Sequence, residues 1–239
     1  MRLDKFVSDG VAMTRSESRK AIKNGRITVD GKIVKDISLH IDENAIVLLD
    51  GREISYREFM YIMLNKPQGY VSATEDKKQK TVLDILDPSY SRYQLFPVGR
   101  LDIDTEGFLL LTNDGDLAHN MLSPNKNVGK TYFLRLEKPI TDKEMEALET
   151  GVDIGGCITK PAKAERISQN EINLTITEGK FHQIKRMAKA VGNEIVYLKR
   201  IAYGNFYLDE ALETGDYRVL TEKETKYLCN VYKRKSLNL

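Results

Sequence analysis

The apolar residues of this 239-residue chain come in short runs. Runs such as Ala45–Leu49, Tyr61–Leu64 and Phe108–Leu111 hold four or five residues, and glycine, proline or charged residues separate them. Runs of this length fit buried strands and are far too short to cross a lipid bilayer. Segments with helical signals, such as Thr141–Thr150, alternate irregularly with these runs. The pattern predicts an α+β fold with a mixed sheet and without a membrane partner.

The first 35 residues combine a helix signal, a hairpin signal and an excess of positive charge. Thr14 followed by Glu17 has the spacing of a capping box and predicts a helix to about Asn24, and Asp30-Gly31 predicts a two-residue hairpin. The net charge is +5 over residues 1–35 and −4 over residues 36–59, although the whole chain carries only +2. Such a local field indicates a polyanionic partner, but a solvated helix face also fits. Three cations would share one face of the helix: Arg15, Arg19 and Lys23.

The chain contains partial matches to known binding motifs, and each match lacks a required residue. Gly129-Lys130-Thr131 lacks the earlier glycine of a phosphate loop, since position 124 is proline, so no nucleotide cofactor is expected. Asp102–Gly107 begins like a calcium loop, but Asn113 stands where the bidentate glutamate is needed. The two cysteines are isolated, which argues against a zinc site or a disulfide and fits a reducing compartment. Acidic residues of the same loop could still bind magnesium in a nuclease, and this alternative stays open.

The N-terminal segment resembles an S4 RNA-binding domain. The likeness lies in Met1–Phe6, Ser16–Lys20 and Asn24–Gly31. It implies a small RNA-binding domain at residues 1–58 and a second domain at residues 59–239. The polar, charged composition of residues 50–60 predicts a connector. The first ten residues include Asp4, Lys5 and Asp9 and lack an apolar leader, so a cytoplasmic protein is expected. Five cations of the S4-like region are expected to contact RNA: Arg15, Arg19, Lys20, Lys23 and Arg26.

The second region resembles the RNA pseudouridine synthases. Gly99–Gly115 is similar to their catalytic motif, and Asn65–Tyr70, Lys130–Tyr132 and Glu178–Met187 are similar to three others in the family's order. Leu198 followed by Arg200 is similar to the last motif. Within the family, the chain looks most like the S4-bearing branch that acts on small-subunit ribosomal RNA. The resemblance implies a mixed, mainly antiparallel sheet in the catalytic domain.

The resemblance also implies the reaction and the residues that carry it. Uridine becomes pseudouridine when the bond from N1 to C1′ breaks and C5 joins C1′, with no metal or cofactor. Asp102 is then the catalytic carboxylate, which either attacks C1′ or removes the 2′ proton. Tyr132 would stack on the extruded base, and Lys185 would keep Asp102 ionised. Leu198 and Arg100 are expected in the base pocket.

A second basic region surrounds the third motif. Residues 178–200 carry a net charge of +4, and a helix over residues 181–191 would place His182, Lys185, Arg186 and Lys189 on one face. The expected substrate is one uridine of small-subunit ribosomal RNA, in an assembly intermediate. Large-subunit ribosomal RNA and a non-catalytic S4-type assembly factor are the alternatives. The expected RNA contacts of this domain are Lys66, His182, Arg186, Lys189 and Arg200.

Overall fold

The computed structural model describes residues 1–11, 13–42, 45–54 and 58–232. The chain divides into two compact units. One comprises Met1–Phe59 with Pro88–Gln94, and the other comprises Met60–Asp87 with Leu95–Leu239. The sequence places the boundary between residues 58 and 59, one position earlier. Within the described ranges, no helix is long and apolar enough to cross a membrane.

The N-terminal unit contains two helices and a four-stranded sheet. Its elements are α1 (Leu3–Gly10), α2 (Arg15–Lys23), β1 (Ile27–Val29), β2 (Lys32–Ile33), β3 (Val47–Leu49) and β4 (Arg52–Glu53), and the strand order is β2-β1-β3-β4. The capping box predicted at Thr14 and Glu17 is confirmed, with Thr14 N donating to Glu17 Oε2 at 2.8 Å. The predicted hairpin is also confirmed: Asp30 and Gly31 have φ values of 50° and 77°.

The predicted connector at residues 50–60 begins too early. Asp50 and Gly51 form a second tight turn with positive φ, and Arg52–Glu53 pairs with β3 as strand β4. Polar composition alone does not separate an exposed two-residue strand from a linker, because both lack a buried face. Residues 55–57 lie outside the described residues.

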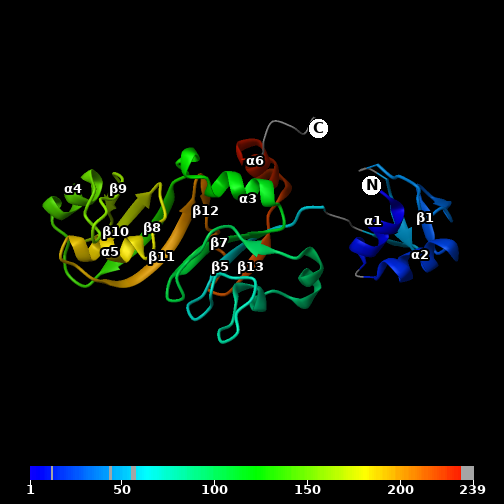
Figure 1. The fold of residues 1–239 in the computed structure, drawn as a ribbon, viewed down its shortest axis with the longest axis horizontal. Coiled ribbons are helices and arrows are strands. Elements are labelled where there is room, and N and C mark those ends of the chain that lie inside the picture. Colours follow the sequence, from blue (N-terminus) through cyan, green and yellow to red (C-terminus); the bar gives the residue numbers. More distant parts are fainter. Residues whose placement is uncertain (12, 43–44, 55–57, 233–239) are drawn as a thin grey trace. The chain divides into compact units, whose positions relative to one another are not determined.

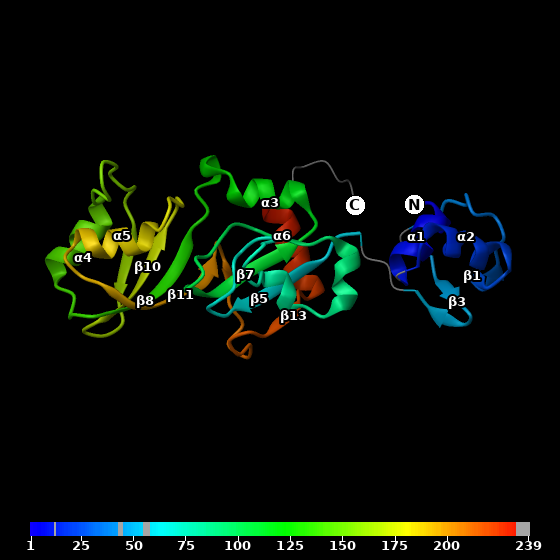
Figure 2. The same ribbon diagram turned by 60° about the horizontal axis from the view of Figure 1, so that its bottom comes forward.

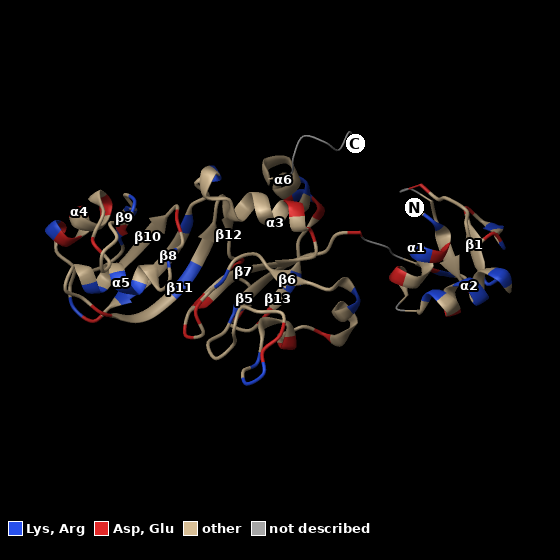
Figure 3. Ribbon diagram, in the orientation of Figure 1, with Lys and Arg blue, Asp and Glu red and all other residues tan. Residues whose placement is uncertain are grey.

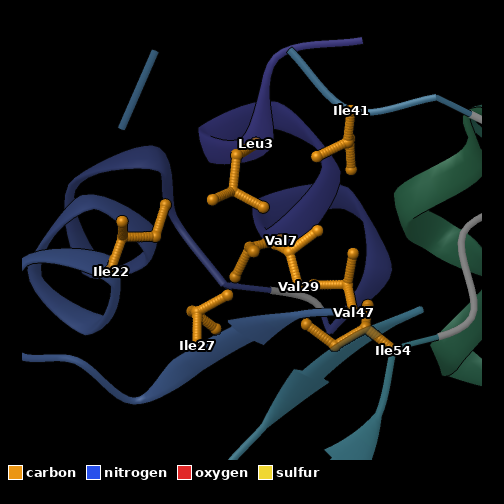
Figure 4. Close-up of a cluster of buried hydrophobic side chains, with 8 residues drawn as sticks. All are labelled: Leu3, Val7, Ile22, Ile27, Val29, Ile41, Val47 and Ile54. Carbon is orange, nitrogen blue, oxygen red and sulfur yellow. The ribbon is translucent and has the colours of Figure 1, made fainter. Parts of the chain in front are cut away.

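The core of the N-terminal unit is an aliphatic cluster under the two helices (Figure 4). Leu3 and Val7 lie one turn apart on α1 and are fully buried, as is Ile22 on α2. Ile27 and Val29 lie two positions apart on β1, so their side chains point to the same side of the strand. The cluster is completed by Ile41, Val47 and Ile54.

The second unit is built on a nine-stranded sheet. Its main path is β13-β5-β7-β11-β8-β10-β9, with β6 paired to β7 and β12 paired to β11. Among the described strands, only β7 and β11 pair in parallel, so the predicted α+β fold with a mixed, mainly antiparallel sheet is confirmed. The strands are β5 (Tyr61–Lys66), β6 (Phe96–Pro97), β7 (Glu106–Thr112), β8 (Lys130–Leu136), β9 (Lys163–Arg166), β10 (Glu171–Ile176), β11 (Ile195–Tyr203), β12 (Phe206–Tyr207) and β13 (Tyr217–Val219).

Two groups of helices accompany this sheet (Figures 1 and 2). The helices α4 (Asp142–Thr150) and α5 (Gln183–Ala190) lie near β8, β10 and β11, whereas α3 (Gly115–Leu122) and α6 (Glu222–Tyr232) lie side by side near β7. Sequence analysis missed α6, although Thr221 and Glu224 have capping-box spacing and make the corresponding hydrogen bonds. The described residues also form three short 3-10 helices: Val82–Ile85, Pro88–Tyr93 and Pro124–Lys126.

The parallel pair β7–β11 requires a glycine next to the predicted catalytic loop. Gly107 has a φ of 104°, and a Cβ atom there would collide with the backbone of Arg200. Only glycine permits both this conformation and this approach. The loop that ends at Thr105 can therefore enter the sheet directly beside β11.

Candidate active site

A buried lysine anchors the backbone of the loop that carries Asp102. Lys66, the last residue of β5, is fully buried, and its Nζ lies 3.1 Å from Asp102 O, 2.9 Å from Thr105 O and 3.0 Å from Pro67 O. Thr105 N also donates to Asp102 O at 3.1 Å, which closes a turn. The backbone of Asp102 is therefore fixed by two hydrogen bonds, while its side chain is 31% exposed.

Burial gives Lys66 unusual chemistry. It lowers the pKa of the ammonium to about 8, although the charges of Asp104 and Asp102 partly oppose this effect. The prediction that Lys66 contacts RNA is wrong, because a fully buried ammonium that serves backbone carbonyls cannot reach a phosphate. Sequence reasoning treated the residue as a surface cation because lysine is usually exposed.

Lys185 on α5 brings the two carboxylates of the loop together. Its Nζ lies 3.3 Å from Asp102 Oδ2 and 2.5 Å from Asp104 Oδ1. The resemblance implied the contact with Asp102, and the structure contains it. The ion pair with Asp104 is an additional contact that the resemblance did not imply. Burial raises the pKa of Asp104, but the hydrogen bond and charge of Lys185 outweigh it, so that the pKa is lower than usual.

His182 approaches Asp102 from the start of the same helix. Its Nε2 lies 3.7 Å from Asp102 Oδ1, and the residue has a left-handed backbone with a φ of 49°. The helix predicted over residues 181–191 is shorter in the structure, where α5 spans Gln183–Ala190. Because the turn before α5 is left-handed, His182 is aimed at the carboxylate rather than lying on the helical stripe with Lys189.

Tyr132 and Leu198 lie on the paired strands β8 and β11. Tyr132 is opposite Arg200 and Leu198 is opposite Leu134, so all four side chains share one face of the sheet. Tyr132 is 8% exposed and Leu198 is 5% exposed. Among the described residues, neither makes a hydrogen bond or ion pair with Asp102, and their roles at the base stay predictions. Arg100 is exposed two positions before Asp102, and its role is likewise a prediction.

Arg200 is part of the core. It is 1% exposed, its Nε donates to Phe108 O at 2.8 Å, and its guanidinium lies 5.4 Å from the centre of the Tyr203 ring. The prediction that Arg200 contacts RNA is wrong, because the sheet buries it. Lys130 Nζ lies 5.2 Å from the centre of the same Tyr203 ring. Burial, together with the charge of Arg200, lowers the pKa of Lys130 to about 8.

The remaining predicted RNA contacts of α5 differ in their surroundings. The Arg186 guanidinium donates to Ile154 O and, at 3.5 Å, to Phe181 O, so it ties together two loops. Lys189 is exposed on α5. Contact with RNA stays a prediction for both residues and for His182.

The cations of α2 are also unequal. Arg19 Nε lies 3.1 Å from Asp4 Oδ2, and the Asp4 side chain is fully buried. Arg26, in the turn before β1, pairs with Asp50 at 2.5 Å. These two residues therefore support the fold, whereas other cations remain available at the surface (Figure 3): Arg15, Lys20 and Lys23. An RNA contact stays a prediction for all five.

The arrangement of the acidic loop does not favour the nuclease alternative. A magnesium site would need the carboxylates of Asp102 and Asp104 as ligands, but the ammonium of Lys185 already bridges them. Within the described part of the chain, no group of three or more His, Cys, Asp or Glu residues is placed to hold a metal ion. One unit of the chain carries a carboxylate paired with an ammonium, and the other is a helix–hairpin unit of the S4 type, a combination that indicates an enzyme acting on RNA.

Comparisons with known proteins identify this class more closely. Residues 60–190 match the model of the RNA pseudouridylate synthase family, and residues 1–47 match the S4 domain. The chain is 54% identical over 235 residues to YtzG, an uncharacterised RNA pseudouridine synthase of Bacillus subtilis, covering 95% of this chain and 98% of that protein. It is 42% identical over 227 residues to ribosomal small subunit pseudouridine synthase A of Escherichia coli, covering 94% and 98%.

A solved structure agrees with the sequence relatives. The crystal structure of a pseudouridylate synthase matches with a TM-score of 0.67 at 38% identity, covering 95% of this chain and 99% of that one. The chain belongs to the RNA pseudouridylate synthase family. It is a pseudouridine synthase with an N-terminal S4 domain, and it isomerises uridine to pseudouridine.

Proposed function

We propose that this enzyme isomerises one uridine of small-subunit ribosomal RNA, with Asp102 as the catalytic carboxylate. The observation that carries the assignment of the residue is the pair formed by Asp102 and Lys185, at 3.3 Å, on a loop anchored by Lys66. The ribosomal substrate is supported by the name of the E. coli relative and by the match along nearly the full length of both chains. A location in the cytoplasm and an assembly intermediate as substrate belong to the same proposal.

The reaction exchanges one bond for another within the nucleotide. The bond from N1 to C1′ breaks, the released uracil turns in its pocket, and a bond from C5 to C1′ forms. The proton on C5 leaves and N1 gains one, so that the product is an isomer of the substrate. Asp102 either attacks C1′ or removes the 2′ proton, and both roles need an ionised carboxylate beside the ribose.

The surrounding residues support that carboxylate. Lys185 places a positive charge 3.3 Å from Asp102 Oδ2, and Lys66 fixes the backbone of the loop from which that side chain extends. Tyr132 and Leu198, neighbours on one face of β8 and β11, offer a ring and an aliphatic wall to an extruded uracil. The proposal assigns them to the base pocket.

Pseudouridine mapping of ribosomal RNA tests this function. We would compare cells that have the gene, cells that lack it, and cells complemented with Asp102→Asn. One small-subunit position should lose its pseudouridine without the gene, and only the unaltered gene should restore it. Loss of a large-subunit position instead would contradict the assigned substrate. Restoration by Asp102→Asn would contradict the assigned carboxylate.

A further inference from the structure

Phe181 exposes an aromatic ring beside the catalytic loop. Its side chain is 74% exposed, and no other large apolar residue in the described ranges is more so. One face of the ring stacks on His182, with centroids 3.7 Å apart and planes inclined by 22°. The exposed area therefore includes the opposite face, which is available for a second stacking partner.

This stacked pair adjoins the reacting group. His182 Nε2 lies 3.7 Å from Asp102 Oδ1, so one ring separates Phe181 from the proposed catalytic carboxylate. A uridine whose ribose lies against Asp102 has neighbouring nucleotides within a few ångströms. Since a single ring separates it from Asp102, Phe181 is within reach of a base adjacent to that uridine.

The segment that carries the ring is held in one conformation. Lys180 N donates to Gln183 Oε1 at 2.8 Å, and Gln183 Nε2 donates to Glu178 Oε1 at 2.8 Å. Gln183 is only 4% exposed, so these bonds lie under the loop. Because the ring is positioned in advance, a ligand that stacks on it loses little to the ordering of the protein.

The charges around Phe181 indicate the kind of ligand. Lys189 is exposed on α5, on which Figure 3 shows basic residues in blue, and Lys180 precedes the ring and pairs with Glu178 at 3.2 Å. Aromatic side chains interleaved with cations are how proteins bind unpaired nucleotides, where the rings take the bases and the cations take the phosphates. An apolar protein partner would gain from the ring but not from these charges.

We propose that Phe181 binds, by stacking, an unpaired base next to the target uridine. The inference builds on the proposed function and narrows its substrate to RNA in which this neighbour is unpaired. Stacking of one base on an aromatic side chain raises affinity by about fivefold to 100-fold, with little dependence on sequence. Phe181 therefore contributes to binding and positioning, and it is not required for bond exchange.

Fluorescence of 2-aminopurine tests this proposal on the full-length protein. The probe is an unstructured nine-nucleotide RNA with one uridine flanked by 2-aminopurine on both sides. The unaltered enzyme should bind it and quench its emission. Phe181→Ala should weaken binding by about tenfold and remove most of the quenching, and Phe181→Trp should restore both. Tyr207→Ala is the control, since Tyr207 is a 69% exposed aromatic residue on β12.

Four results would overturn the proposal. Three are a nine-mer that the unaltered enzyme neither binds nor quenches, equal binding and quenching by Phe181→Ala and the unaltered enzyme, and equal losses in Tyr207→Ala and Phe181→Ala. The fourth uses the same probe annealed to a complement: further quenching of that duplex on addition of the enzyme would contradict stacking on an unpaired base. Phe181→Ala alone could lose binding of the nine-mer while no ribosomal uridine depends on the gene. That outcome would support base stacking on Phe181 and contradict the assigned ribosomal substrate.

Discussion

Lys185 lies closer to Asp104 than to the proposed catalytic residue two positions earlier. The distance from Lys185 Nζ is 2.5 Å to Asp104 Oδ1, compared with 3.3 Å to Asp102 Oδ2. The ammonium is therefore shared, and Asp104 helps to hold it in place. Consequently Asp104 acts on the site through Lys185, and the two aspartates should respond differently to the same substitution.

Asp102→Asn should abolish most turnover and leave RNA binding intact. Asparagine keeps the shape and removes the charge, and loss of a carboxylate that reacts or accepts a proton reduces the rate by about 10²- to 10⁴-fold. Asp104→Asn should reduce it less, by about tenfold, because only the position of Lys185 is affected. Single-turnover rates at saturating enzyme measure both. Equal losses in the two variants would contradict these roles.

Lys185→Met should slow the reaction more than it weakens binding. Methionine retains much of the side-chain length, whereas the charge beside Asp102 is lost. Lys189→Met is the matched control, since Lys189 is exposed one turn further along α5. That variant should mainly reduce affinity and lower the salt dependence by about one unit. A Lys185→Met enzyme with a normal saturated rate and poor binding would make Lys185 a phosphate contact.

Lys66→Met should change how stability depends on pH. The pKa of Lys66 is about 8 in the folded protein, compared with an ordinary value of 10.5, so the unfolded chain binds more protons between these values. The contribution of Lys66 to the free energy of unfolding therefore rises as pH rises from 8 towards 10. Relative to the variant, the unaltered protein should gain on the order of 1–3 kcal/mol over this range.

Urea denaturation at pH 8, 9 and 10 measures this difference. Lys163→Met serves as the control, because Lys163 is an exposed lysine on β9. Its stability should run parallel to that of the unaltered protein. Parallel curves for Lys66→Met as well would mean that the buried ammonium does not titrate in this range.

Arg15→Glu combined with Lys23→Glu should weaken RNA binding by the full-length protein. Both residues are exposed on α2, and each lost phosphate contact should reduce the salt dependence of binding by roughly one unit. The charge-matched comparison is between single reversals, where Arg52→Glu on β4 should have a smaller effect than Arg15→Glu. Arg19 is unsuitable for this test because its substitution would remove a partner of the buried Asp4. Unchanged affinity across a salt titration would make α2 a solvated face.

Excess EDTA should leave activity unchanged on a short RNA that folds without magnesium. The proposed chemistry relies on a carboxylate and a polar pocket, and it has no step that needs a Lewis acid. Conversion of uridine with and without EDTA measures the effect. A loss of activity that added Mg²⁺ restores would contradict the proposed mechanism.

Local spacing in the sequence was enough to predict much of the secondary structure. Thr14 with Glu17, and Thr141 with Glu144, lie three residues apart and form the capping boxes that their spacing predicts. Asp30-Gly31 forms the predicted hairpin because positive φ at two adjacent positions is a local property. The pairing of Lys185 with Asp102 came from the resemblance to a family, since the two residues are far apart in the chain.

The sequence by itself determined the capped helices, the hairpin and the motifs that indicate an RNA pseudouridine synthase. Only the tertiary structure decided which cations face solvent and which serve the fold. Lys66 contacts Asp102 O across 36 positions, and Arg200 contacts Phe108 O across 92. Burial depends on neighbours that long-range strand pairing brings together, and a local pattern of charges holds no record of them. Through these long-range contacts, Lys66 and Arg200, which were expected to bind RNA, instead donate hydrogen bonds to backbone carbonyls of the unit that carries the site.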